Sequence, residues 1–189
     1  MKNLKNKISL ILLVITSFNV NAQESKKIDV AQSKIHWVGK KVTGQHEGTI
    51  NFQDGVLVFK DKKLAGGNFT VDMTSINTTD LSGKGKENLD KHLKADDFFG
   101  VDQYPTATIV FKSLGKKSNN VYAVTADLTI KNITHPVKFD ITVDKNSANA
   151  ALKVDRTKYD IKYKSKNFFE GLGDNVIYDE FELAVDIKF

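Results

Sequence analysis

The sequence contains no cysteine among its 189 residues. This absence excludes disulfide bonds, thiolate metal ligands and a cysteine nucleophile. Other chemical signatures are missing as well: there is no Gly-x-Ser-x-Gly nucleophile elbow, and the four histidines do not have the spacing of metal ligands. We therefore expect no metal, no cofactor and no catalytic residue, and the folded chain must rely on its hydrophobic core.

Long apolar runs are also scarce, and the one that occurs, ISLILLVITSF, lies near the N-terminus behind the basic stretch MKNLKNK. The run is too short to span a bilayer, and small or polar residues follow it up to Ala22, which is the order of a secretory signal peptide. We predict a signal peptide over residues 1–22 and export to the periplasm or out of the cell; an uncleaved membrane anchor is the alternative. After cleavage we expect no stable membrane insertion.

A strong excess of one charge is absent once this segment is set aside. The chain has 28 Lys and Arg against 23 Asp and Glu, a net charge of +5. Residues 1–22 hold three lysines and no acid, which leaves 25 basic against 23 acidic residues, a net charge of +2. We therefore expect no nucleic acid as a partner. The 167 residues that remain of 189 suffice for one domain with its own core.

Strict alternation of apolar and polar residues is the main structural signal in this chain. It is clearest in four stretches: NFTVDMTSI (68–76), TATIVFK (106–112), VKFDITVD (137–144) and FELAVDIKF (181–189). Such alternation is typical of antiparallel strands with one buried face. Shorter matches separated by turn-like stretches, including QDG (53–55) and KDKKLAGG (60–67), bring the total to about eight strands. The pattern predicts an all-β fold, either an up-and-down barrel or a sandwich.

One segment departs from this pattern. KENLDKHLKADDF (86–98) has no β-branched residue, places Leu89 and Leu93 one turn apart, and is followed by Gly100. We predict one main helix within residues 84–99. The preceding TTDLSGKGKEN (78–88) is predicted to be a flexible approach, because GKGK lacks the spacing of a phosphate-binding loop.

The same helix carries the best candidate for acid/base chemistry. His92 and Asp96 are four residues apart and would share a helix face, but a helical zinc site needs a second histidine, and Asp97 points elsewhere on a helix. The architectural interpretation is that Leu89, Leu93, Phe98 and Phe99 close the helix over one barrel end. We favour architecture and keep an enzyme acting on a lipid as the alternative.

Four separated stretches resemble the YceI-like family in the family's order. These are IDVAQSKIHWVGKKVTGQHEGTI, HLKADDFFGVDQYPTATIVFKS, ADLTIKNITHPVKFDI, and KVDRTKYDIKY with LGDNVIYDEFELAVDI. The resemblance covers residues 27–189, effectively all of the chain after the predicted signal peptide. It implies a lipocalin-like antiparallel barrel that binds a polyisoprenoid or another long apolar lipid without catalysis, in an exported bacterial protein.

The resemblance turns the inward-facing residues into candidate ligand contacts. Those that we predict to contact the lipid are Trp37, Phe52, Phe69, Met73, Phe111, Phe139, Arg156, Phe168 and Phe169. Phe168 and Phe169 lie in KSKNFFEGLGDNV (164–176), where the family pattern is shorter and richer in glycine; they suggest a lid or entry lip, and packing on the barrel rim is the alternative. Arg156, Lys40 and Lys41 are candidates for a phosphate head group. Alternation alone leaves open whether the barrel is hollow or has a solid core, and a structural or stress-related envelope protein with a solid core is the other alternative function.

Overall fold

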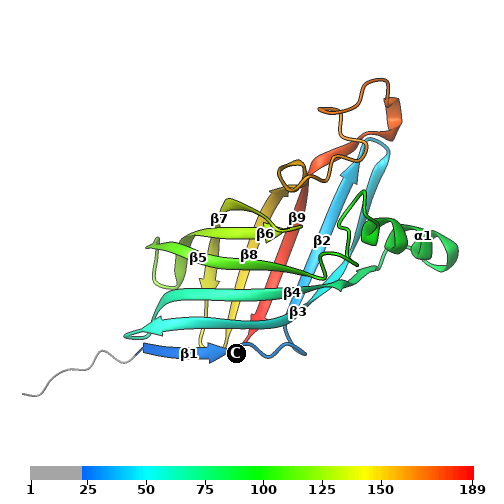
Figure 1. Cartoon of the computed structure of the whole chain (residues 1–189). Coiled ribbons are helices and arrows are strands. Elements are labelled where there is room, and N and C mark those ends of the chain that lie inside the picture. Colours follow the sequence, from blue (N-terminus) through cyan, green and yellow to red (C-terminus); the bar gives the residue numbers. More distant parts are fainter. Residues whose placement is uncertain (1–22) are drawn as a thin grey trace, which may run out of the picture.

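The computed structural model describes residues 23–189; the predicted signal peptide, residues 1–22, lies outside the described residues. The described part contains nine strands and one α-helix (Figure 1). The strands are β1 (Gln23–Lys27), β2 (Lys34–Lys41), β3 (Gly44–Lys60), β4 (Lys63–Thr78), β5 (Thr106–Lys116), β6 (Val121–Ile130), β7 (Ile133–Val143), β8 (Ser147–Asp155) and β9 (Ile177–Lys188). Helix α1 (Gly83–Lys94) separates β4 from β5, and two short 3-10 helices, η1 (Arg156–Tyr159) and η2 (Gly173–Asn175), separate β8 from β9.

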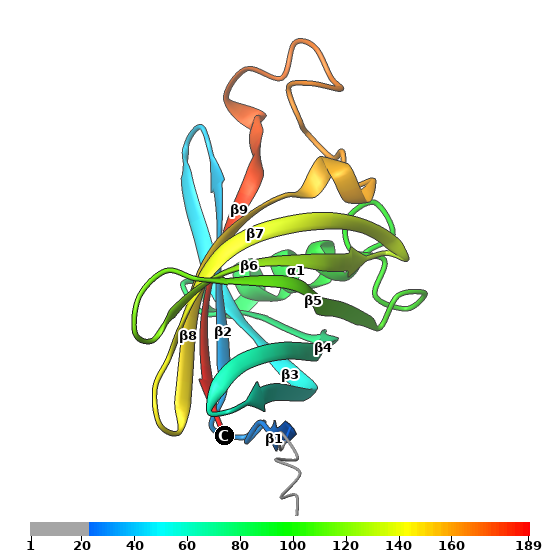
Figure 2. The same cartoon turned by 90° about the vertical axis from the view of Figure 1, so that its left-hand side faces the viewer.

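The strands close into a barrel of the predicted up-and-down type. Each strand from β2 to β8 pairs antiparallel with the next one in sequence, and β9 pairs with β2, so eight strands form a ring (Figures 1 and 2). Strand β1 pairs with Val56–Lys60 of β3 and is not part of the ring. Closure gives nearly every strand two neighbours, which removes the exposed edges of an open sheet.

The alternation in sequence corresponds to the two faces of the barrel wall. In β6 the side chains of Tyr122, Val124, Ala126, Leu128 and Ile130 are buried, and the residues between them are more exposed. In β9, Phe181, Leu183, Val185 and Ile187 face the interior. The predicted orientation of these strands is confirmed.

The predicted turn at QDG is wrong. Gln53, Asp54 and Gly55 lie inside β3, where the pairing with β4 shifts register between Phe52 and Asp54. Gly55 is needed for packing, because a Cβ there would come within 2.4 Å of the Phe69 ring. The chain reverses only at Asp61 and Lys62, whose positive φ angles form the tight turn between β3 and β4.

The predicted helix is confirmed, and both of its boundaries need correction: it begins one residue before residue 84, and residues 95–99, predicted to continue it up to Gly100, form turns instead. GKGK, predicted to be a flexible approach, forms the first turn of α1, which begins at Gly83 and ends at Lys94. Residues 95–105 then lead into β5, and the carbonyl of Pro105 accepts a hydrogen bond from the Met73 amide at 2.9 Å. Among residues 23–189, no helix has the length and apolar character needed to cross a membrane.

Candidate functional site: an apolar cavity in the barrel

The barrel encloses two adjoining apolar cavities. The space that atoms leave empty in and around the first cavity is about 870 Å³, and around the second about 600 Å³, with adjoining open solvent included. The two cavities share five lining residues, namely Ile35, Val71, Ala107, Leu128 and Leu183. They therefore form one interior, and these five residues lie at the boundary between its two parts.

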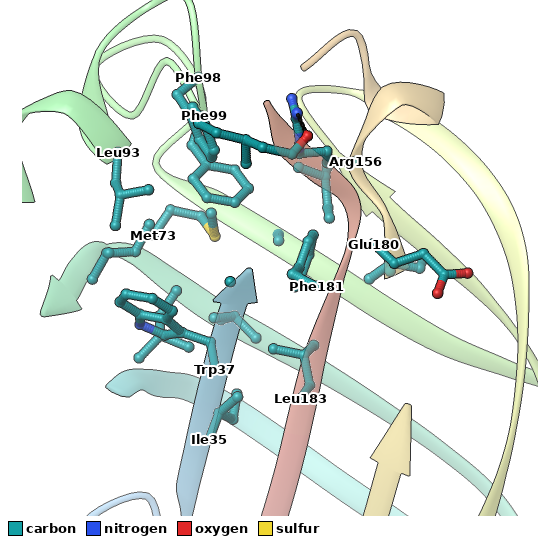
Figure 3. Close-up of a pocket in the computed structure, with 18 of the residues that line it drawn as sticks. Ile35, Trp37, Met73, Leu93, Phe98, Phe99, Arg156, Glu180, Phe181 and Leu183 are labelled. Atoms are coloured by element: carbon teal, nitrogen blue, oxygen red, sulfur yellow. Dashed lines mark hydrogen bonds between the residues drawn. The ribbon is translucent and has the colours of Figure 1, made fainter. Parts of the chain in front are cut away.

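The first cavity lies at the end of the barrel where β8 ends and β9 begins. Its floor and walls include Trp37, Met73 and Leu183, and it is covered by Leu93 of α1 with Phe98 and Phe99 of the following segment (Figure 3). The ring of Phe99 meets that of Phe181 edge-on, with centroids 6.3 Å apart. The end of α1 and residues 95–99 therefore close this end of the barrel, as the architectural interpretation expects.

The second cavity lies deeper and is lined by a continuous row of phenylalanines. Phe52, Phe69, Phe111 and Phe139 come from four strands, and the centroids of neighbouring rings are 5.8 Å apart throughout the row. Tilted and edge-on contacts at this distance are favourable for aromatic pairs. The row gives the deep cavity a smooth hydrocarbon wall.

Partial exposure of inward-facing side chains shows that the interior is hollow. Phe111, Phe139, Phe181 and Leu183 face the barrel axis, yet they are only partly buried. In a close-packed core, side chains in these positions would be covered on all sides. Here they lack neighbours on the side that faces the cavity.

The lining of the first cavity reaches the protein surface at the exposed Tyr178 and Glu180. We infer that the cavity opens there, and we call this site, with the neighbouring lining residues Gly39 and the buried Arg156, the mouth. Pairing between β2 and β9 is interrupted there, because Gly39 pairs with Phe181 while Lys41 pairs with Ile177. The Tyr178 side chain is 48% exposed, and Glu180 is exposed as well. In Figure 3 the Glu180 carboxylate points away from the apolar side chains. Polar groups are thus confined to the rim of an otherwise apolar cavity.

Arg156 is a buried structural element of this rim. Its side chain is 2% exposed and donates hydrogen bonds to the carbonyls of Ile161 (2.7 Å), Ile177 (3.0 Å) and Tyr178 (3.2 Å). Asp179 lies 3.6 Å away, close enough for charge attraction but too far for a hydrogen bond. Burial lowers the pKa of the Arg156 guanidinium, and the nearby carboxylates of Asp179 and Asp155 oppose this shift.

The structure brings together seven of the nine predicted ligand contacts. Trp37, Met73 and Arg156 line the first cavity, and Phe52, Phe69, Phe111 and Phe139 line the second. Phe168 and Phe169 lie outside both linings and are 50% and 49% exposed. The two other head-group candidates differ in their surroundings: Lys40 pairs with Glu182 at 2.9 Å, and Lys41 ends β2 beside the mouth. Contact of any of these residues with a ligand stays a prediction.

Several lining residues were not selected from the sequence. They are Ile35, Ile50, Val71, Ile76, Ala107, Leu128, Ile130, Phe181 and Leu183 on the strands, Leu93, Phe98 and Phe99 at the covered end, and Ile177, Tyr178 and Glu180 at the start of β9. The alternation carried the signal for the strand residues, since every inward position of a hollow barrel lines its cavity. No sequence signal marked the start of β9, where the register shift relative to β2 decides which side chains face the cavity.

The candidate acid/base residues do not assemble at the cavity. His92 packs between the rings of Tyr163 and Phe98, with centroid distances of 4.4 and 5.4 Å. Its Nδ1 lies 3.9 Å from Asp97, whereas Asp96 lies beyond the end of α1. His92 lines neither cavity. This geometry favours the architectural interpretation of the segment.

Comparison with known proteins agrees with this geometry. The family model described as the YceI-like domain matches residues 27–189. The chain belongs to the YceI-like family. Curated relatives include Protein YceI of Shigella flexneri, 36% identical over 93 residues, and a UPF0312 protein of Shewanella denitrificans, 34% identical over 90 residues. These alignments cover 49% and 48% of this chain and 46% and 45% of the relatives, so the chain spans slightly less than half their length.

Solved structures share the fold of this YceI-like chain. BcnA of Burkholderia cenocepacia has a TM-score of 0.69 at 23% identity, covering 85% of this chain and 98% of that one. A polyisoprenoid binding domain from Saccharophagus degradans, implicated in plant cell wall breakdown, has a TM-score of 0.58 at 15% identity, covering 85% and 95%. At these identities the similarity establishes the barrel fold alone.

Proposed function

We propose that this YceI-like protein binds the hydrocarbon chain of a polyisoprenoid, or of a similarly long apolar lipid, inside its barrel. It sequesters or carries this lipid in the aqueous part of the cell envelope, to which the predicted signal peptide would direct it. The observation that carries the proposal is the hollow interior: two adjoining cavities lined almost wholly by hydrocarbon side chains. The polyisoprenoid-binding description of the Saccharophagus degradans domain supports the choice of ligand class.

The energetics of burial favour a long, flexible apolar ligand. Each methylene or methyl group moved from water into such a cavity contributes roughly 0.8 kcal/mol. An isoprene unit has five carbons, so each unit that fits contributes about 4 kcal/mol before the entropy of ordering the chain is subtracted. A polar ligand would leave unpaired groups against the phenylalanine row. The polar rim at the mouth leaves room for a head group at the water-facing end.

Lipid extraction is the direct test of this function. The purified protein is extracted with organic solvent, and the extract is analysed by mass spectrometry for lipid in stoichiometric amount. We expect a chemically unchanged isoprenoid or comparable lipid, and the extracted protein should melt at a lower temperature, because a ligand that binds only the native state stabilises it by mass action. Adding a polyprenol should restore the melting temperature.

A substitution in the deep cavity tests whether the lipid occupies it. Phe111→Gln places an amide among apolar side chains, and the stabilisation by polyprenol should then be lost. The proposal fails if extraction leaves the melting temperature unchanged and no polyprenol raises it. Recovery of a chemically modified lipid would instead favour an enzyme.

A further inference from the structure

Exposed large apolar side chains gather at the mouth end of the barrel. Among residues 23–189, six large apolar residues are exposed: Val30, Val42, Val110, Phe168, Phe169 and Tyr178. Four of them lie in the β2–β3 turn (Val42), in the segment between β8 and β9 (Phe168 and Phe169) or at the start of β9 (Tyr178). Figures 1 and 2 show this segment, in orange, projecting beyond the ends of β2 and β9. A cluster of exposed apolar groups at one place marks an interaction surface.

Hydrogen bonds hold this projecting segment in a defined shape. The amide of Val42 donates to the carbonyl of Val176 (3.1 Å), and that of Ile177 donates to the carbonyl of Lys164 (3.0 Å). The amides of Phe168 and Phe169 both donate to the carbonyl of the fully buried Ser165, at 3.1 and 3.0 Å. These bonds tie the tip of β2–β3 and the aromatic pair to the start of β9.

Basic side chains alternate along the approach to the aromatic pair. Lys162, Lys164 and Lys166 precede Phe168, and the ammonium of Lys162 lies 5.2 Å from the centre of the Phe168 ring while pairing with Asp160 at 2.7 Å. Lys41 and Lys158 add positive charge at the same end of the barrel, and Glu170 and Asp174 are the acids that follow the aromatic pair. Lys41, Lys158, Lys164 and Lys166 have no ion-pair partner within the described chain. Residues 160–178 and 41–44 together hold four lysines and three acids, a net charge of +1, and the acids at 170 and 174 follow the aromatic pair while the lysines precede it.

The same segment forms part of the mouth. Ile177, Tyr178 and Glu180 line the first cavity and directly follow the projecting residues. Whatever the aromatic pair contacts is therefore brought close to the opening of the apolar interior.

We propose that residues 160–178 and the β2–β3 turn at 41–44 form a docking surface for an anionic phospholipid bilayer. Phe168 and Phe169 enter the interfacial layer, where aromatic side chains partition favourably, and the lysines contact anionic head groups. Docking is peripheral and directs the mouth toward the hydrocarbon layer. This surface is an addition to the proposed function, and it would be useful to a protein that carries a lipid.

Vesicle co-sedimentation tests the docking surface. Protein freed of lipid by extraction is mixed with vesicles of phosphatidylcholine alone, or of equal parts phosphatidylcholine and phosphatidylglycerol, at low and high salt. We expect binding to the anionic vesicles that weakens as salt screens the charges. Phe168→Ser with Phe169→Ser should lower binding by about tenfold or more, because two half-exposed aromatic rings no longer enter the interface. Lys164→Glu with Lys166→Glu should lower it by on the order of tenfold on anionic vesicles only.

Two control variants match these changes elsewhere on the surface. Val110→Ser removes an apolar side chain that is 42% exposed on β5. Lys116→Glu with Lys145→Glu reverses two charges at the opposite end of the barrel, at the ends of the β5–β6 and β7–β8 turns. Both should bind vesicles as the unaltered protein does.

Three results would overturn the docking surface. These are vesicle binding that survives the Phe168/Phe169 change, equal loss in the control variants, or failure of the unaltered protein to bind vesicles. If that failure is accompanied by a change in oligomeric state on removal of the aromatic pair, the surface serves a protein contact instead. The vesicles contain no isoprenoid, so vesicle binding is measured independently of the lipid cargo. If no lipid is found in the barrel, vesicle binding can still be observed. If vesicle binding fails, lipid is still expected in the extract of the purified protein.

Discussion

Ala107 occupies the position where a single side chain can separate the two cavities. It lies on β5, is 6% exposed, and is the smallest of the five residues that line both cavities. Replacing Ala107 with phenylalanine would place a ring between the mouth and the phenylalanine row. A polyprenol that needs both cavities could then no longer pass this level.

The expected magnitudes separate ligand binding from stability. Burying the new ring contributes roughly 1.5–3 kcal/mol, and overpacking against its neighbours costs a similar 1–3 kcal/mol, so the ligand-free variant should differ in stability from the unaltered protein by no more than about 2 kcal/mol. The ring takes the space of about one isoprene unit, which is worth roughly 4 kcal/mol of burial. Binding of a long polyprenol should therefore weaken by nearly three orders of magnitude, whereas a short one confined to the first cavity should bind almost unchanged.

The assay measures thermal shifts and dissociation constants for polyprenols of increasing chain length. Ala123→Phe is the matched control, because Ala123 is exposed on the outer face of β6. The reasoning is refuted if Ala107→Phe binds the longest polyprenol as tightly as the unaltered protein, or if Ala123→Phe shows the same loss.

Three further predictions concern stability. A Cβ on Gly48 would lie 2.1 Å from the Asn77 carbonyl oxygen and 2.6 Å from the Trp37 ring, so Gly48→Ala should lower the free energy of unfolding by roughly 1–3 kcal/mol. Gly115→Ala is the control, because a Cβ there would have nothing within 4 Å, and it should not lower the stability. Equal effects of the two changes in denaturant titrations would contradict this prediction. Burial, with a smaller contribution from Asp155, raises the pKa of Tyr159 to about 12. In the unfolded chain the tyrosine pKa is about 10. The stabilisation linked to this shift, roughly 3 kcal/mol of the free energy of unfolding, is therefore fully present below pH 10 and is lost as pH rises to 12. Tyr159→Phe should remove that part of the pH dependence, and an unchanged alkaline slope would disprove the assignment. Arg156→Ala leaves three carbonyls and Asp179 without their buried partner, and should cost about 3–5 kcal/mol in chemical unfolding; a loss below about 1 kcal/mol would show that water replaces the guanidinium.

Period-two alternation was sufficient to predict antiparallel strands and the buried face of each, and the family resemblance favoured a barrel over a sandwich. In β9, for example, Phe181, Leu183 and Val185 could face only one side of the sheet, and burying that side requires them to point inward. The helix was predictable for a similar reason, because its residues lack the β-branched pattern of the strands. The motifs in family order fixed the expected ligand class.

Glycines show where local sequence was misleading. The Gly in QDG looks like a turn residue, but the Phe69 ring needs the space that a side chain would fill. Likewise Gly83 and Gly85 suggested a flexible approach, although both lie in the first turn of α1. A glycine allows backbone conformations and close contacts that other residues do not. Residues distant in sequence decide whether it forms a turn or allows another side chain to pack against the backbone.

The sequence by itself determined the order of the strands, their inward faces and the apolar character of the interior, because these follow from residue types and a repeat of two. Only the tertiary structure decided that the interior is hollow. The same inward side chains produce a solid core in a narrow ring and a cavity in a wider one, and the width depends on how all eight strands pair and tilt together. The mouth likewise arises from a register shift between β2 and β9, two strands that are far apart in sequence.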